Sequence, residues 1–167
     1  MTTQLTPITP EAYREGMSNL AGAVNVVTTD GPAGKAGFTA TAVCSVSDDP
    51  ATLLVCLNRS TSVHSVFNEN THIAINTLMP EHEPLSNLFG GKAPMQDRFA
   101  AGNWETLTTG APVLSNAAVN FDCIITERES VATHDVIFCQ VIDIKINPQA
   151  GALLYLHRAY CPIPSSQ

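Results

Sequence analysis

Clusters of basic residues are missing from this chain of 167 residues. It carries eight Lys and Arg against fifteen Asp and Glu, which gives a formal net charge of −7. A protein that binds the backbone of DNA or RNA needs several Lys and Arg side chains close together. We therefore expect no nucleic-acid partner.

Long apolar runs are missing as well. No stretch approaches the roughly 20 apolar residues that a membrane-spanning helix needs. The first ten residues, MTTQLTPITP, lack the cationic start and the apolar core of a secretory signal. We expect a soluble, cytoplasmic protein without a membrane partner.

Closely spaced metal or disulfide ligands are also lacking. The five cysteines are odd in number and form no CxxC pair, and the five histidines show no short regular spacing. A structural zinc site needs paired ligands, so no metal is expected. Cys56, Cys123 and Cys139 lie inside apolar runs, which favours reduced, buried thiols in a reducing compartment.

What is present is the composition of one globular domain. The chain is 44% hydrophobic and 14% charged, and its 167 residues are enough to bury one sizeable core. Because no repeat, low-complexity segment or linker divides it, we predict one domain over residues 1–167.

Short β-strands separated by turns dominate the pattern. Alternating or β-branched stretches predict strands over 23–29, 37–47, 52–58, 72–77, 119–129, 136–146 and 152–157. Apolar residues at helical spacing predict helices over 10–20 and 60–67 and two short pieces within 80–99. Because the strands follow one another through short turns, we predict a mainly β fold with short helices, an antiparallel barrel rather than a wound parallel sheet.

The stretch GFTATAVCSVSDD, residues 37–49, places small and hydroxylated side chains on both faces of a predicted strand. One interpretation is an edge strand rich in Thr and Ser with one hydrated face. The other is a platform where a planar heterocycle lies close to the backbone, because no bulky side chain intervenes. The residues alone leave both open.

The stretch CLNRSTS, residues 56–62, lies where a strand is predicted to end and a helix to begin. Helix N-termini bind anions through free N–H groups and the helix dipole, and Arg59 adds a permanent charge suited to phosphate. A helix cap alone would need only one hydroxyl from Ser60, Thr61 and Ser62. The crowd of donors favours a phosphate site.

Three further segments hold candidate residues. His134, at a turn before an apolar strand, is a candidate hydrogen-bond donor or proton source, although a lone His is more often structural. Arg158, Tyr160 and Arg98 are compatible with contact to an anionic ligand and equally with solvated or neutralised charges. No nucleophile with its base and no GxGxxG motif accompanies them. The residues therefore predict only a binder of a phosphorylated heterocycle.

Taken in order, the segments 21–60, 83–104, 120–141 and 153–160 resemble the short-chain flavin reductase family, the small partners of two-component flavin monooxygenases. EPLSNLFGGKAPMQDRFAA and THDVIFC are most similar to the NADH:FMN reductases of bacterial pyrimidine degradation. TATAVCSVSD is equally similar to the reductase component of 4-hydroxyphenylacetate 3-monooxygenases. One departure from the family pattern is Ala132, which stands where a glycine is usual.

The resemblance implies a homodimeric, antiparallel and Greek-key-like split β-barrel with the flavin at the subunit interface. It also implies hydride transfer from NADH, or NADPH, to FMN or FAD, and release of reduced flavin to a partner monooxygenase. His134 is implied to be catalytic, beside the nicotinamide. The implied flavin-binding residues are Phe38, Thr39, Ala40, Thr41, Ala42, Val43, Cys56, Leu57, Asn58, Arg59, Ser60, Ser62, Arg98, Arg158 and Tyr160.

Two other functions fit the same residues less well. A non-catalytic FMN-binding module that stores flavin or senses redox state would keep the phosphate site without needing His134. An oxidase acting on a phosphorylated pyridoxine would need several basic residues for a second phosphate. Because this chain is poor in them, that function ranks last.

Overall fold

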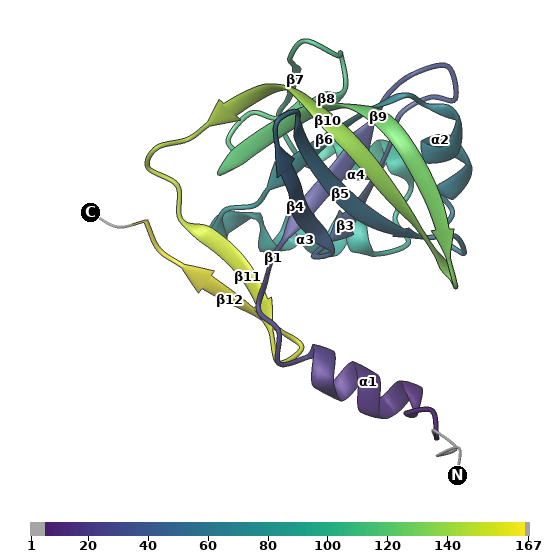
Figure 1. Cartoon of the computed structure of the whole chain (residues 1–167). Coiled ribbons are helices and arrows are strands. Elements are labelled where there is room, and N and C mark those ends of the chain that lie inside the picture. Colours follow the sequence, from purple (N-terminus) through teal and green to yellow (C-terminus); the bar gives the residue numbers. More distant parts are fainter. Residues whose placement is uncertain (1–5, 166–167) are drawn as a thin grey trace.

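The structure is a computed structural model that describes residues 6–165. Residues 1–5, part of the stretch used above to argue against a secretory signal, and residues 166–167 lie outside the described residues. Antiparallel strands make up most of the described chain, with a few short helices (Figure 1). The prediction of a mainly β, antiparallel fold is confirmed.

The largest sheet has seven strands in the order β3-β2-β6-β9-β10-β5-β4. These strands are β2 (Asn25–Thr29), β3 (Ala36–Ala40), β4 (Val43–Asp48), β5 (Ala51–Asn58), β6 (His72–Thr77), β9 (Val119–Val131) and β10 (His134–Ile146).

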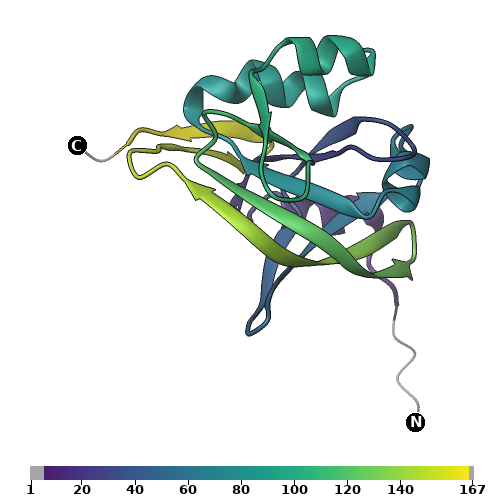
Figure 2. The same cartoon turned by 90° about the horizontal axis from the view of Figure 1, so that it is seen from above.

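Two smaller sheets and the helices complete the described chain. The three-stranded sheet consists of β1 (Gly22–Ala23), β11 (Ala152–Leu156) and β12 (Ala159–Ile163), and the two-stranded sheet of β7 (Trp104–Thr106) and β8 (Pro112–Leu114). The helices are α1 (Pro10–Met17), α2 (His64–Glu69), the 3-10 helix η1 (Pro80–His82), α3 (Glu83–Gly90) and α4 (Met95–Ala100). Viewed from above, α3 and α4 lie together on one side of the large sheet (Figure 2).

The two edge strands of the large sheet, β3 and β4, are separated in sequence by only Thr41 and Ala42. Three peptide units span at most about 11 Å, so the sheet curls until its edges approach each other at these two residues. The carbonyl of Ala42 accepts the N–H of Cys56 at 3.1 Å, which attaches the linking segment to the β5 side. Within residues 6–165 no ladder joins β3 to β4, so hydrogen bonds do not close the sheet.

The core fills the inside of this curl. Along β5, Leu53, Val55 and Leu57 are buried while the residues between them are half-buried. This period of two is what a strand with one face on a core produces. Ile137 and Cys139 of β10 point into the same core.

The observed elements depart from the predicted ones in several places. The strand predicted over 23–29 is divided into β1 and β2, which belong to different sheets, and the helix predicted over 10–20 ends at Met17. The strand predicted over 37–47 is broken at Thr41 and Ala42 into two edge strands. The helix predicted from residue 60 begins at His64, because the preceding residues form a turn instead. The short strands β7 and β8 and the last strand, β12, were not predicted, because such short stretches carry too little alternation to be recognised.

Helix α1 stands apart from the sheets, and none of its residues is buried (Figure 1). It begins as predicted, with Thr9 Oγ1 accepting the N–H of Ala12 at 3.1 Å and with Pro10 at the first helical position. Within the described range, no helix is both long enough and apolar enough to cross a membrane.

Candidate functional site

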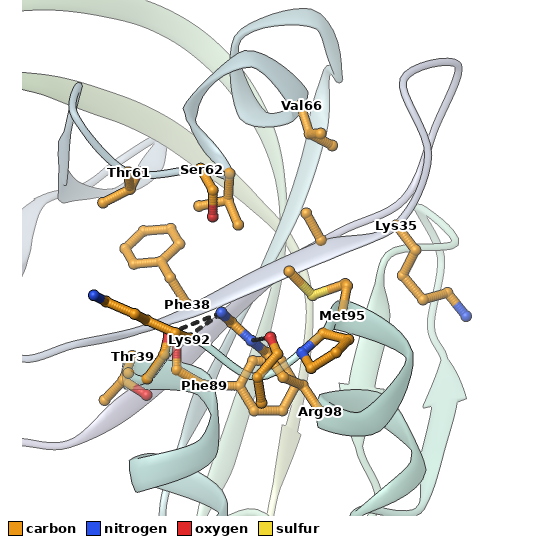
Figure 3. A pocket seen from close by; sticks show the side chains of 16 residues that line it. Lys35, Phe38, Thr39, Thr61, Ser62, Val66, Phe89, Lys92, Met95 and Arg98 are labelled. Atoms are coloured by element: carbon orange, nitrogen blue, oxygen red, sulfur yellow. Dashed lines mark hydrogen bonds between the residues drawn. The ribbon is translucent and has the colours of Figure 1, made fainter.

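A cavity of about 880 Å³ opens between β3, the turn before α2 and the loop joining α3 to α4 (Figure 3). Of the predicted site residues, it brings together Phe38, Thr39, Ser62 and Arg98. Gly90 and Gly91 keep the loop side of the cavity free of bulky side chains. The cavity is therefore large enough to receive part of a nucleotide and is open along a strand edge.

One wall of this cavity is the turn after β5, which Asn58 organises. The Asn58 side-chain oxygen accepts both the N–H and the hydroxyl of Ser60 at 2.9 Å, and its carbonyl accepts the hydroxyl of Thr61 at 2.9 Å. Thr61 and Ser62 line the cavity, and Figure 3 shows the Ser62 hydroxyl directed into it. The wall thus presents hydroxyl groups from a turn rather than from a helix terminus.

The opposite wall carries a cation that the sequence analysis missed. Lys92, in the loop between α3 and α4, is exposed and lines the cavity across from Thr61 and Ser62 (Figure 3). A lysine ammonium is a compact point charge suited to a phosphate. The available signal was a lone cation in the Gly-rich stretch GGKAP of a chain with few cations.

Arg98 holds the loop that carries Lys92. Its side chain is buried, and its Nε and Nη atoms donate to the carbonyls of Ala93, Phe89 and Gly91 at 2.9 to 3.0 Å. A further bond, at 3.2 Å, reaches the carbonyl of Gly37 on β3. Direct contact of Arg98 with a cofactor stays a prediction. The observed bonds give it the role of fastening the loop to the strand edge.

The predicted platform, residues 38–43, presents backbone more than side chains. Phe38 points into the core, where its ring meets that of Phe67 edge-on at a centroid distance of 5.0 Å. Ala40 is buried, and Val43 is partly buried against the same core. Leu57, on β5, is 1% exposed, so only its backbone is available to a ligand.

A second hollow, of about 490 Å³, lies at the other end of this platform. Thr41, Ala42 and Arg158 line it together with Met17 of α1 and Tyr155 of β11. The predicted platform therefore runs between two hollows, with Thr39 on the first and Thr41 and Ala42 on the second.

Arg158 lies in the tight turn between β11 and β12. Both turn residues, His157 and Arg158, have positive φ angles of 50° and 60°. Such turns favour Asn and Gly, so these residues keep an unfavourable backbone at the rim of the second hollow. Arg158 also forms an exposed ion pair with Glu15 of α1 at 2.8 Å, which connects the helix to this turn.

Tyr160 joins the small sheet to α3. Its hydroxyl lies 2.8 Å from Ser86 Oγ and donates to Asn87 Oδ1 at 3.1 Å. The carbonyl of Ser86 in turn accepts the hydroxyl of Thr39 at 2.7 Å. Tyr160 is thus connected to the platform through α3 and does not line either hollow.

His134 begins β10 and lies opposite Asn58 in the ladder between β10 and β5. This register places it beside the turn that carries Ser60 and Ser62. Its ring nitrogen Nδ1 is 2.9 Å from the hydroxyl of Thr133. The structure therefore places His134 beside the end of β5 that leads into the predicted phosphate turn, although His134 lines neither hollow.

Arg59 faces the tip of the β9–β10 hairpin rather than the cavity. Its guanidinium donates to the carbonyls of Ala132 and His134 and lies 3.4 Å from Asp135 Oδ1. Its backbone N–H donates to the carbonyl of Thr133 at 3.0 Å. These bonds join the turn after β5 to the hairpin tip. A contact between Arg59 and a phosphate stays a prediction.

Cys56 is half-buried on the side of β5 opposite to Leu57, and burial raises the pKa of its thiol. Cys123 and Cys139 are fully buried, and desolvation raises the pKa of the Cys139 thiol to about 12. Thiols in this state are poor nucleophiles and poor metal ligands. Among residues 6–165, no group of three His, Cys, Asp or Glu side chains is arranged to hold a metal ion.

Comparison with known proteins extends over nearly the whole chain. Residues 17–164 match the family described as flavin reductase like domain. A protein of Yersinia enterocolitica named FMN reductase (NADH) RutF is 58% identical over 151 residues, which cover 90% of this chain and 83% of that protein.

Solved structures share the fold. A Haemophilus somnus protein assigned as a flavin reductase superposes with a TM-score of 0.91 at 43% identity, covering 93% of this chain and all of that one. A homologue of nitrilotriacetate monooxygenase component B from Mycobacterium thermoresistibile has a TM-score of 0.84 over 90% of this chain and 84% of its own; its 22% identity concerns the fold alone. On the family match and the 58% identity, this chain belongs to the flavin reductase like domain family.

Proposed function

We propose that this protein is an NADH-dependent FMN reductase. The single observation that carries the proposal is the cavity between the wall of Thr61 and Ser62 and the cation Lys92, lined along one side by Thr39 of the edge strand β3. The 58% identity to a protein named as an NADH-dependent FMN reductase supports the same activity.

The residues present fit a flavin nucleotide. The Ser62 hydroxyl and the Lys92 ammonium lie on opposite walls of the cavity, and both can donate to a phosphate monoester. The backbone from Thr39 to Ala42 carries only small side chains, so a flat ring can lie close to it. Gly90 and Gly91 leave room on the loop side. We propose that Ser62 and Lys92 hold the phosphate and that the segment 39–42 backs the ring.

When both nucleotides are bound, hydride passes from C4 of the nicotinamide to N5 of the flavin, so that NADH and a proton reduce FMN to FMNH₂ and leave NAD⁺. The residues of this chain bind and orient the two rings and exclude water between them. We propose that His134 lies beside the nicotinamide. Because both hollows are open at the surface, reduced flavin can leave and serve a partner monooxygenase component.

Steady-state kinetics test the activity directly. Purified protein should oxidise NADH only when FMN is added, and FAD and NADPH should each give a lower kcat/KM than FMN and NADH. NADH oxidation that does not depend on flavin would contradict the proposal. Tight FMN binding without turnover would instead favour a module that stores flavin or senses redox state.

We propose that the curled seven-stranded sheet is a split β-barrel and that residues 1–167 form one domain. The support is the two-residue link between the edge strands β3 and β4, which brings the two edges together without a shared ladder. The break at Thr41 and Ala42 is then the split of the barrel, and the predicted ring platform lies along it.

We also propose that the protein is a homodimer and acts in the cytoplasm. Apolar side chains lie on the outer face of the large sheet, with Val46, Ile124, Ile142 and Ile144 each 38–47% exposed. The ladder partners Thr52, Gln140 and Ile124 make this face continuous across β5, β10 and β9. Several exposed apolar side chains on one sheet are typical of an interface between subunits.

A further inference from the structure

One buried carboxylate connects the two halves of the proposed site. Asp135, the residue after His134, is only 7% exposed. His64 Nε2 lies 2.6 Å from one carboxylate oxygen, and Ser130 donates its hydroxyl to the other at 2.7 Å. Arg59 Nη1 lies 3.4 Å from that second oxygen. The three partners come from the start of α2, from β9 and from the turn after β5.

These partners hold Asp135 in its ionised form. Hydrogen bonding from His64, then from Ser130, lowers the pKa of Asp135 below its ordinary value of 3.8, against the opposing effect of burial. A buried carboxylate is costly unless it is paired and hydrogen-bonded. The three contacts therefore stay together as a unit, and loss of the charge should loosen all of them.

The unit lies between the cavity wall and the hairpin tip. Thr61 and Ser62 line the cavity, and only Val63 separates Ser62 from His64 at the start of α2. On the other side, Arg59 binds the carbonyls of the tip. One carboxylate thus connects the start of α2, next to the cavity wall, with the hairpin that carries His134.

The hairpin tip needs such support. Ala132 has a φ of 50°, a left-handed conformation that is unfavourable for a residue with a side chain. Strained backbone of this kind persists only where surrounding contacts hold it. The bonds from Arg59 to Ala132, Thr133 and His134 supply those contacts, and Asp135 orients Arg59.

We propose that Asp135 is a positioning residue that sets the flavin-phosphate wall and His134 relative to each other, so that it governs the affinity for both nucleotides. This inference rests on the proposed reductase function. It makes Asp135 distinct from His134, whose removal should affect use of NADH alone.

Replacement Asp135→Asn tests the inference, because it removes the charge with little change in volume. The matched control is Asp143→Asn, a half-buried carboxylate further along the same strand that accepts the Thr108 hydroxyl at 2.8 Å. We expect the KM values for FMN and NADH to rise together in Asp135→Asn, each by about tenfold, the equivalent of ~1.4 kcal/mol. The kcat should fall less than KM rises, and Asp143→Asn should match the wild type.

A second variant covers the case in which Asp135→Asn does not fold. His64→Asn leaves the carboxylate paired with Ser130 and Arg59, and should raise both KM values in the same direction by less. If the residues act as one unit, the double variant should be no worse than Asp135→Asn alone.

Two outcomes overturn the inference: KM values in Asp135→Asn that match those of Asp143→Asn, or a rise for only one nucleotide. The dissociation constant for FMN, measured by quenching of flavin fluorescence, provides a readout without turnover. A wild-type protein that binds FMN but does not oxidise NADH would defeat the proposed function. The FMN affinity of Asp135→Asn would still decide the flavin half of the inference.

Discussion

Single cations carry unusual weight in this protein, because only eight Lys and Arg side chains serve the whole chain. The Arg98 guanidinium donates hydrogen bonds to backbone carbonyls, and the Arg59 guanidinium donates to carbonyls of the hairpin tip. Of the two lysines that line the cavity, Lys35 lies 3.9 Å from Asp30 and over the Phe99 ring, whereas Lys92 extends from the loop wall opposite Ser62 (Figure 3). The charge recognised at the phosphate is therefore expected to come from Lys92.

Replacement Lys92→Ala should raise the KM for FMN by about fivefold, since a hydrogen bond to a charged group is worth about 1.5–3 kcal/mol and exposure to solvent reduces this. The KM for NADH should change less. Steady-state rates at varied FMN measure the effect, with Lys145→Ala, a lysine on β10 paired with Glu105, as the control. An unchanged KM for FMN would remove Lys92 from the proposed phosphate site.

Replacement Ala132→Gly should stabilise the protein by about 0.5–1 kcal/mol. Glycine relieves the left-handed strain, worth about 1–2 kcal/mol, but adds freedom to the unfolded chain, worth about 0.4–1 kcal/mol. Urea unfolding measures the difference. Ala100→Gly, at the last residue of α4, relieves no left-handed strain and should not stabilise the protein. Destabilisation by both would show that the tip is not strained.

At the scale of elements, the contact between β3 and α3 positions the cavity. A Cβ at Gly37 would meet the Phe89 ring at 2.6 Å, so only glycine allows the helix to lie this close to the strand. Phe89 also lines the cavity, and its ring packs edge-on with Phe99 at 5.2 Å. The position of α3 in the cavity wall therefore depends on the absence of a side chain at residue 37.

Replacement Gly37→Ala should destabilise the protein by about 1–3 kcal/mol, the usual cost of overpacking a core, and should weaken FMN binding because α3 must shift. Denaturant unfolding and FMN titration measure the two effects. Gly16→Ala is the opposite case: nothing lies within 4 Å of its Cβ position in α1, so alanine should raise helix stability. A neutral Gly37→Ala would mean that α3 adapts without cost.

At the scale of the whole molecule, exposed apolar side chains lie on two surfaces of the described chain: the outer face of the large sheet and helix α1. Ile144 on β10 is 46% exposed, and Met17 and Tyr13 of α1 are 43% and 57% exposed. A second copy of the chain would cover such surfaces by burying apolar area.

Sedimentation should therefore give about twice the chain mass of 17.8 kDa. Replacement Ile144→Lys places a charge on the outer face and should shift the equilibrium toward the monomer, whereas Lys145→Ala on the neighbouring position should not. A wild-type protein that sediments as a monomer at micromolar concentration would contradict the proposed dimer.

Much of this architecture follows from local patterns. Alternation along TLLVCLN and the β-branched run AVNVVTT predict β5 and β2, because a strand with one buried face must alternate. The cap Thr9 with Pro10 predicts the start of α1 for an equally local reason. The hydrogen-bond donors in residues 58–62 also identify, by their chemistry, the turn that forms one wall of the cavity. The small residues in 37–49 identify the strand that forms the platform.

Only the tertiary structure decided which distant residues meet. Sequence patterns do not show that β3 and β4 are opposite edges of one sheet, that Arg98 turns inward to backbone carbonyls, or that His64 reaches Asp135 across 71 positions. These contacts depend on the curl of the sheet and on strand register, which the summed packing of the core determines. Local propensity selects the elements, whereas long-range packing selects their partners, and the proposed site depends on the partners.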